Sequence, residues 1–123
     1  MSERFEIVEK ALIGMLSDKK YKTLRDILVT MNPADIAAVF SDLDNQQIPL
    51  LFRLLPKEMA ADTFVEMEPD AQEILIRGFS DNELKEIVDE LYVDDAADLV
   101  EEMPANVVKR ILKQADPELR YSI

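Results

Sequence analysis

The sequence predicts an all-α protein that is built from short helices in a repeating unit of about twelve residues. Apolar residues recur at positions i, i+3, i+4 and i+7, which is the spacing of one face of an α-helix. Proline falls at a regular place in the repeat, whereas only two glycines occur and no alternating apolar pattern persists, so β-structure has little support. The predicted architecture is a right- or left-wound superhelical solenoid of stacked, short antiparallel helices.

The first predicted element is a helix from about residue 2 to residue 16. It keeps an apolar face and is followed by a basic loop, DKKYK, at residues 18–22. We interpret residues 1–22 as an atypical N-terminal cap of capping helix and basic loop. Residues 23–123 are then the helical repeats, and the length of 123 residues predicts a single compact domain overall.

A twelve-residue repeat organises the rest of the chain. Its marker positions are Met31, Leu43, Leu55, Met67, Phe79, Leu91, Met103 and Ala115. The apolar stripe keeps the same phase in Leu24, Ile27, Leu28 and Met31, in Ile36, Val39, Phe40 and Leu43, in Leu84, Ile87, Val88 and Leu91, and in Val108, Ile111, Leu112 and Ala115. We predict that these positions form the core. Each unit then holds eight or nine helical residues and a turn of three or four, and a helix that short must pack on its neighbours.

Proline and capping residues mark where the predicted helices begin. Five prolines follow a marker position by one or two residues, where the first helical turn has no N–H bond to lose: Pro33, Pro56, Pro69, Pro104 and Pro117. Ser80 and Glu83 have the spacing of a capping box. Pro49 is out of phase with the repeat and predicts that its helix begins near Ile48.

Composition excludes several classes of function. The chain has no Cys and no His, which removes disulfides, thiolate metal sites, cysteine nucleophiles and the commonest general base. It also has no glycine-rich phosphate loop, nucleophile elbow or zinc motif, so we expect no enzyme. Apolar runs are far shorter than the roughly 20 residues of a membrane span, and the N-terminus mixes acids into the place of a signal peptide's basic region. We therefore expect neither secretion nor direct insertion of this part of the chain into a membrane.

Acidic residues dominate the charge of the protein. The 14 bases and 26 acids give a net charge of −12, a field that repels nucleic acid and anionic lipid and attracts cations or basic partners. The acids gather in residues 81–102, here called the acidic segment, where Lys85 is the only base. Its ten acids are Asp81, Glu83, Glu86, Asp89, Glu90, Asp94, Asp95, Asp98, Glu101 and Glu102. The acidic segment therefore carries most of the net charge.

The last predicted helix of the acidic segment places four carboxylates on one face. Asp94, Asp98, Glu101 and Glu102 follow the spacing i, i+4, i+7 and i+8, and like charges at that spacing cost a few tenths of a kcal/mol each. Three interpretations remain open: a solvated face, a docking face for a basic protein, and a site for a hard divalent cation. No EF-hand loop occurs, but Mg2+ keeps most of its waters and needs only one or two carboxylates per site.

Three runs of sequence resemble a known family. They are MNPADIAAVFSDLD at residues 31–44, LLFRLLPKEMAADTFVEM at residues 50–67 and ELKEIVDELYVDDAADLVEEMP at residues 83–104. Together they resemble the cytosolic N-terminal domain of MgtE-type magnesium transporters over about residues 24–119. The resemblance implies that a superhelical regulatory domain is followed by a pair of CBS domains and a membrane channel. It also implies that the full-length protein forms a homodimer.

The resemblance also implies a regulatory mechanism and a set of site residues. Mg2+ ions bind between the acidic N-terminal domain, the CBS domains and the connecting helices, and they hold a compact state that closes the pore when cytosolic Mg2+ is plentiful. By the family motif, the metal-contacting positions are Asp62, Asp94 and Asp98. Asp62 stands where relatives often have Glu, so its reach is shorter. Asp95, Glu101 and Glu102 are expected to deepen the local negative potential.

The end of the sequence suggests that this chain is a piece of a longer protein. Asp116 and Pro117 begin another helix, but the chain stops six residues after Pro117. If the CBS pair and membrane part of the same polypeptide are missing, half of each composite metal site is missing too. We therefore expect the isolated domain, at the cytoplasmic face of the cell membrane, to bind regulatory Mg2+ only weakly, in the millimolar range or worse.

Two alternatives are protein-interaction modules without a metal. One is a flagellar motor switch protein of the FliG type, whose middle region uses similar helical repeats with an "LP…A…L" pattern. Its EHPQ-like motif and charged C-terminal helix do not occur in this sequence. The other is a generic helical-repeat protein-binding module. Calorimetry with Mg2+ on a longer chain would separate the magnesium sensor from both.

Overall fold

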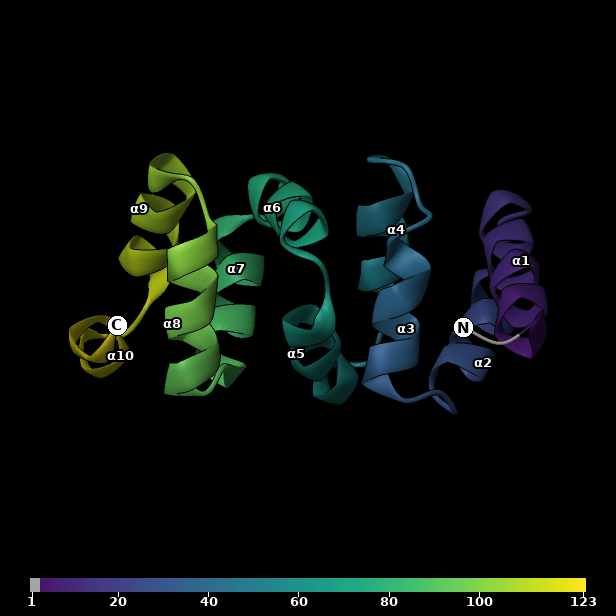
Figure 1. The fold of residues 1–123 in the computed structure, drawn as a ribbon, viewed down its shortest axis with the longest axis horizontal. Helices are drawn as coiled ribbons and strands as arrows, with labels where there is room; N and C mark the ends of the chain where they lie inside the picture. The colour runs from purple at the N-terminus through teal and green to yellow at the C-terminus, as the bar shows by residue number, and fades with distance from the viewer. Residues whose placement is uncertain (1–2) are drawn as a thin grey trace. The chain divides into compact units, whose positions relative to one another are not determined.

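The computed structural model describes residues 3–123, and within that range the chain forms α-helices and no strand (Figure 1). The predicted all-α class is therefore confirmed. The chain divides into two compact units, Met1–Glu66 and Met67–Ile123, and each is described by itself below. The predicted division at residue 22 and the predicted single domain stay predictions. No helix in residues 3–123 combines the length and the apolar character that crossing a membrane requires.

The first unit contains five helices. They are α1 (Glu3–Ser17), α2 (Tyr21–Leu28), α3 (Pro33–Phe40), α4 (Gln47–Arg53) and α5 (Lys57–Glu66). The first helix ends within one residue of the prediction, and its predicted start at residue 2 lies outside the described residues. The predicted basic loop is shorter than expected, because α2 already begins at Tyr21. The chain reverses within three residues because Lys19 adopts a φ of 61°, which lets its N–H and that of Lys20 bond back to α1.

Aromatic rings at a twelve-residue spacing form the centre of the first unit. Phe40, Phe52 and Phe64 come from α3, α4 and α5 and are almost fully buried. Both neighbouring ring pairs have centroids 6.3 Å apart in an edge-to-face arrangement, which aromatic pairs prefer. The most extensive helix pairing of this unit joins α3 to α5. The repeat therefore delivers one ring per helix to a common core.

Helix α4 of the first unit begins one residue before the predicted start. Its backbone is prepared by Asp44, whose carboxylate accepts the N–H groups of Gln46 and Gln47 at 2.9 and 2.8 Å. Pro49 then lies in the first helical turn, where its missing N–H leaves no hydrogen bond unmade. The helix begins four residues after the marker position Leu43, whereas the other helices that follow a marker begin two residues after it, so the out-of-phase proline goes with a delayed helix that has a local cap.

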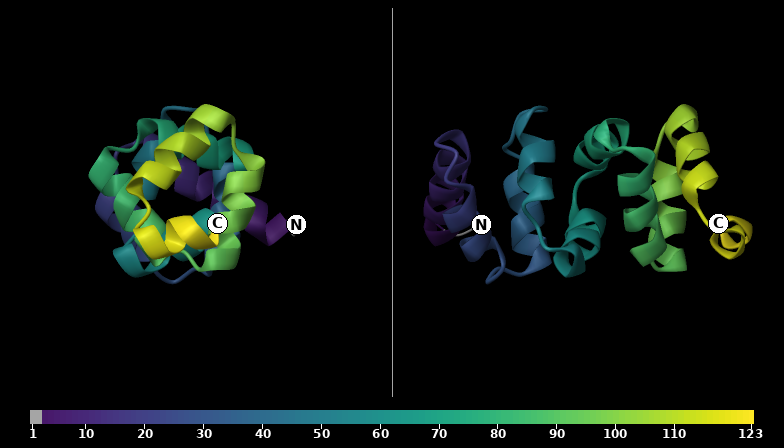
Figure 2. Two further views of the ribbon diagram at one scale, coloured as in Figure 1. Left: turned by 90° about the vertical axis from the view of Figure 1, so that its left-hand side faces the viewer. Right: turned by 180° about the vertical axis from the view of Figure 1, so that it is seen from behind.

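The second unit repeats with a regular period. Its helices are α6 (Pro69–Gly78), α7 (Asp81–Glu90), α8 (Val93–Glu102), α9 (Ala105–Gln114) and α10 (Pro117–Ser122), seen from further sides in Figure 2. The first four have 10 residues each, and two residues connect each helix to the next. The turns are therefore shorter, and the helices longer, than the predicted three or four and eight or nine residues.

Extended backbone at the marker positions explains these short turns. The residues at the C-caps of α6 to α9 all adopt extended conformations with ψ from 141° to 152°, and they are Phe79, Leu91, Met103 and Ala115. The next residue is extended as well and serves as the N-cap of the following helix. Two extended residues reverse the chain and leave the marker side chain against the core: Phe79, Met103 and Ala115 are buried and Leu91 is half-buried.

The predicted helix caps are largely confirmed. Ser80 and Glu83 form a reciprocal capping box at the start of α7, with N···O distances of 3.0 and 3.1 Å. Asn32 and Asp116 cap α3 and α10 by accepting backbone N–H groups at 2.9 and 2.8 Å. The five prolines that follow a marker position occupy the first helical position or immediately precede it.

The predicted core is confirmed at most positions, with Ile27 on α2 half-buried and the largest departure on α9. Six of the eight marker positions are buried, and Met31 and Leu91 are half-buried. On α9 the fully buried residues are Val107 and Ile111, whereas Val108 and Leu112 of the predicted stripe are half-buried. The stripe is rotated because α9 packs against both α7 and α6, and Val107 shares a hollow with Ile76 of α6.

Candidate functional site

Helix α7 forms the first half of the acidic segment in the second unit. Its capping box fixes the N-terminus, and Leu84, Ile87 and Val88 bury one face. α7 packs against α9 with that face. The acids of α7 consequently point away from the core: Asp81, Glu86, Asp89 and Glu90 are exposed and Glu83 is half-buried.

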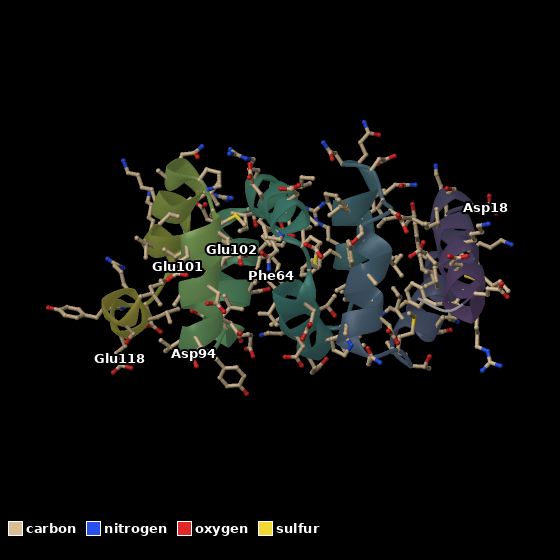
Figure 3. The ribbon with its side chains drawn as sticks, viewed as in Figure 1. Asp18, Phe64, Asp94, Glu101, Glu102 and Glu118 are labelled. Carbon is tan, nitrogen blue, oxygen red and sulfur yellow. The ribbon has the colours of Figure 1, made fainter. Side chains whose placement is uncertain are left out.

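Helix α8 presents the most acidic surface. Ala96 and Leu99 are its buried residues, with 0% and 4% of their surface exposed. The polar side carries Asp94, Asp98, Glu101 and Glu102, all of them exposed, and these four residues are called the acidic ridge below. Figure 3 shows Asp94 near the start of α8 and Glu101 and Glu102 near its end. The helical spacing therefore aligns the four carboxylates as predicted.

Intramolecular bases do not neutralise the acidic ridge. Within the acidic segment, Lys85 pairs with Asp89 at 2.9 Å along α7, and Arg110 of α9 pairs with Asp81 at 3.1 Å. In the part of the chain that the structure describes, no Lys or Arg forms an ion pair with a ridge carboxylate. The last turn of α8 also has no base, so Glu101 and Glu102 face the negative end of the helix dipole. The ridge is thus exposed, repulsive and locally uncompensated.

The three predicted metal-contacting residues belong to different units. Asp94 and Asp98 lie one helical turn apart on α8 of the second unit, and Asp62 is exposed on α5 of the first. Among residues 3–123, no three acidic side chains converge closely enough to enclose a metal ion. The ridge can therefore offer one or two carboxylates to an ion that keeps its water shell, and the roles of Asp62, Asp94 and Asp98 stay predictions.

Sequence reasoning missed an acid pair in the first unit. A hydrogen bond with Asp42, burial, and the negative charges of Asp42 and Glu6 raise the pKa of the Glu9 carboxyl from 4.5 to about 7. Glu9 lies four residues after Phe5 and three before Leu12, so its place on the apolar face of α1 was a usable signal. Its partner, Asp42, follows α3 in the chain, and no pattern in the sequence predicts that the two acids meet.

Arg110 is the second residue that sequence reasoning missed. Its guanidinium group donates hydrogen bonds to the carbonyl oxygens of Ile76 and Phe79, in addition to its contact with Asp81. These carbonyls lie at the C-terminal end of α6, where backbone acceptors have no helical partner. Arg110 therefore fixes the turn that leads into the acidic segment. The acceptors are about thirty residues away along the chain, so local patterns contain no trace of them.

Comparisons with known proteins give one matching family model and two solved structures of similar fold. The model of the family described as "MgtE intracellular N domain" matches residues 31–123. The chain is similar to a solved structure of the cytosolic domain of the Mg2+ channel MgtE in complex with ATP, with 27% identity, a TM-score of 0.75, and coverage of 92% of this chain and 47% of that one. A structure of the soluble part of a magnesium transporter is similar in fold, with 18% identity and a TM-score of 0.79 over 97% of this chain and 47% of that one. The chain thus spans about half the length of these relatives. No protein with a curated description matches.

Proposed function

The chain belongs to the MgtE intracellular N domain family, and on that premise we propose that it is the regulatory, Mg2+-sensing domain of a magnesium transporter or channel. The family consists of transporter domains, which are not a class of enzymes. In this proposal the acidic ridge binds Mg2+ together with a second acidic module of the same polypeptide, a pair of CBS domains. Binding favours the closed state of a membrane pore that is likewise part of the full-length, homodimeric protein.

One observation carries the proposal. The four carboxylates of the acidic ridge are exposed on one helix, and no Lys or Arg of residues 3–123 pairs with any of them. A surface that served solubility alone would gain stability from interspersed lysines at i+4, and α7 has such a pair in Lys85 and Asp89. The absence of this relief on α8 favours a function in which an external cation supplies the positive charge.

The geometry supports Mg2+ in its hydrated form. Mg2+ releases its waters reluctantly and commonly binds through one or two carboxylates. Asp94 and Asp98 are adjacent on the helix surface and offer such a pair, whereas no enclosed three-acid cage exists within the described residues. Binding to this chain alone is accordingly weak. A facing acidic surface would raise the affinity, because the ion then removes the repulsion between two modules as well as the repulsion within α8.

The proposed mechanism is a linkage between ion concentration and association. At low Mg2+, two acidic surfaces repel one another and the modules stay apart. Ions that bind better to the associated arrangement shift the population toward it, and the size of the shift equals the difference in binding free energy between the two arrangements. A change from mostly apart to mostly associated requires about 5.5 kcal/mol of such difference, which several weak ion sites can supply together.

The experiment that tests this function compares compactness with and without the ion. A protein that contains residues 1–123 and the proposed CBS pair is titrated with Mg2+ and followed by small-angle scattering and limited proteolysis. We expect the radius of gyration to fall and protease protection to rise. The paired substitution Asp94→Asn with Asp98→Asn should shift the transition to higher Mg2+.

Matched controls make the outcome specific. The exposed acids Asp26 and Asp70 lie on α2 and α6, outside the acidic segment. The pair Asp26→Asn with Asp70→Asn changes the net charge by the same amount and should leave the transition in place. Equal compactness with and without Mg2+, or an equal shift from both pairs of substitutions, would refute the proposal.

A further inference from the structure

The turn between α1 and α2 carries a basic surface that the Mg2+-sensing proposal does not use. Lys19, Lys20, Lys22 and Arg25 lie within one short stretch and are all exposed, and these four residues are called the basic turn below. They are four of only 14 bases in a chain of net charge −12. In the described range of the chain, none of the four forms an ion pair with a carboxylate. Their charge is therefore available to a partner.

Lys19 occupies a backbone conformation that favours glycine. Its φ is 61°, and Lys19 is the one non-glycine residue among residues 3–123 with a positive φ. The N–H groups of Lys19 and Lys20 donate to the carbonyl oxygens of Leu16 and Met15 at 3.2 and 2.9 Å, which is the pattern of a Schellman motif at the end of α1. Glycine is the usual residue at this place. A lysine here gives up backbone stability and keeps a positive side chain at the tip of the turn.

One base of α2, Lys22, is also placed against the local electrostatics. Lys22 lies in the first turn of α2, where the helix dipole is positive and acids are favoured, whereas Arg25 lies in the last turn, where a base is favourable. The first turn of α2 has no acid, and its N-cap residue Lys20 makes no side-chain capping bond. Lys19 and Lys20 are favourable at the end of α1 and Arg25 at the end of α2, but the dipole does not explain Lys22. The stretch is therefore more basic than helix formation requires.

An aromatic side chain lies within the basic turn. Tyr21 stands between Lys20 and Lys22 with 37% of its surface exposed. Tyr21 and Arg25 are spaced i and i+4 on α2, and Val29, the C-cap residue at i+8, is 46% exposed. This face combines bases with a ring and an aliphatic side chain. Such a composition is typical of surfaces that lie in the headgroup region of an anionic bilayer.

We propose that the basic turn docks on an anionic phospholipid surface. The inference rests on the proposed function, which puts the domain at the cytoplasmic side of a membrane. Lysine and arginine contact the headgroup phosphates, and Tyr21 lies at the interface between polar and apolar regions. Acids elsewhere in the chain repel the anionic surface, but this repulsion is screened beyond the Debye length, which is about 8 Å at physiological ionic strength. Within residues 18–26 the four bases outnumber the two exposed acids Asp18 and Asp26, so the turn stays locally positive.

Binding of the 123-residue chain to vesicles tests this inference. Phosphatidylcholine vesicles with and without about one third of phosphatidylglycerol are sedimented with the protein in EDTA, at low and at physiological salt. EDTA removes Mg2+, so the result does not depend on ion binding at the acidic ridge. At physiological salt we expect partition into the anionic vesicles only, and at low salt we expect weaker partition, because the longer Debye length there lets the net charge of the chain repel the vesicle. The substitution Lys19→Gln with Lys20→Gln and Lys22→Gln should lower the partition coefficient by about 100-fold, or about fivefold per lysine.

The control replaces three exposed lysines elsewhere, with the same change in net charge: Lys57→Gln, Lys109→Gln and Lys113→Gln. It should bind like the unsubstituted chain, and circular dichroism should show that both variants remain helical. No preference for anionic vesicles, or equal losses in both variants, would overturn the proposal. Binding to polyglutamate in place of vesicles would also overturn it and assign the basic turn to an acidic protein.

Discussion

Arg110 of α9 and Asp81 of α7 form an ion pair of 3.1 Å across the second unit. The same guanidinium group donates to the carbonyl oxygens of Ile76 and Phe79, so one side chain joins the end of α6, the start of α7 and the middle of α9. Asp81 is thereby compensated, in contrast to the acids of α8. The acidic segment therefore begins at a fixed point and becomes unpaired toward the ridge.

Substitution of Arg110 should destabilise the second unit. Arg110→Ala removes a charged donor from two backbone acceptors, and we expect the free energy of unfolding to fall by about 2–3 kcal/mol. Arg110→Lys should recover only part of this loss, because an ammonium group lacks the planar fork that reaches several acceptors. Urea denaturation followed by circular dichroism measures both. Lys109→Ala, at the exposed neighbouring position, should change stability by less than about 0.5 kcal/mol; a similar loss there would contradict the role assigned to Arg110.

Replacement of Lys19 by glycine should separate stability from lipid binding. Lys19→Gly removes the steric penalty of a side chain at a φ of 61°, and we expect stability to rise by about 1 kcal/mol. The same change should weaken binding to anionic vesicles. Thermal unfolding and vesicle sedimentation on one sample give both numbers. Lys20→Gly, at a residue with negative φ, is the matched control and should not stabilise. A destabilised Lys19→Gly variant would contradict the description of the turn.

The Glu9 carboxyl predicts a dependence of stability on pH. Its pKa in the folded chain is raised from 4.5 to about 7, so its stabilising contribution is complete below pH 4.5 and is lost as the pH rises through 7. Glu9→Gln keeps a neutral hydrogen-bonding group and should remove this loss. Relative to the unsubstituted chain, the variant should therefore gain stability from pH 5 to pH 8. Because Glu9 is partly exposed, the gain should be less than about 1.4 kcal/mol for each pH unit. Chemical denaturation of both chains at pH 5 and at pH 8 checks this. If the difference in unfolding free energy between the two chains is the same at both pH values, the result argues against the Glu9–Asp42 hydrogen bond.

Local periodicity explains how much of the fold the sequence predicts. The all-α class, the capping box of Ser80 and Glu83, and the exposure of Asp94 and Asp98 depend on residues within one or two helical turns of each other. The length of the turns was not predictable in the same way. It depends on extended backbone at Phe79 and the equivalent positions, and an apolar residue there fits a longer turn equally well.

Long-range relationships explain what the sequence did not predict. Arg110 meets α6 and Asp81, and Glu9 meets Asp42, only after the helices have packed. The rotated stripe of α9 has the same origin, because contact with α6 is a tertiary feature. For the metal site, Asp62, Asp94 and Asp98 were assigned by family resemblance, and their proposed role also requires a facing module. The family assignment disfavours the flagellar switch alternative, and the resemblance was therefore more informative about function than the charge pattern alone.

The stability of the chain in Mg2+ tests the central claim that an external cation relieves the acidic ridge. Unfolding of residues 1–123 is measured in increasing MgCl2 and in NaCl of equal ionic strength. If the ridge binds Mg2+ in the folded state, a concentration about ten times the dissociation constant should stabilise the chain by about 1.4 kcal/mol beyond the effect of NaCl. The pair Asp94→Asn with Asp98→Asn should abolish the excess, whereas Asp26→Asn with Asp70→Asn should retain it. Equal stabilisation by the two salts, or an undiminished Mg2+ effect without Asp94 and Asp98, would contradict the account.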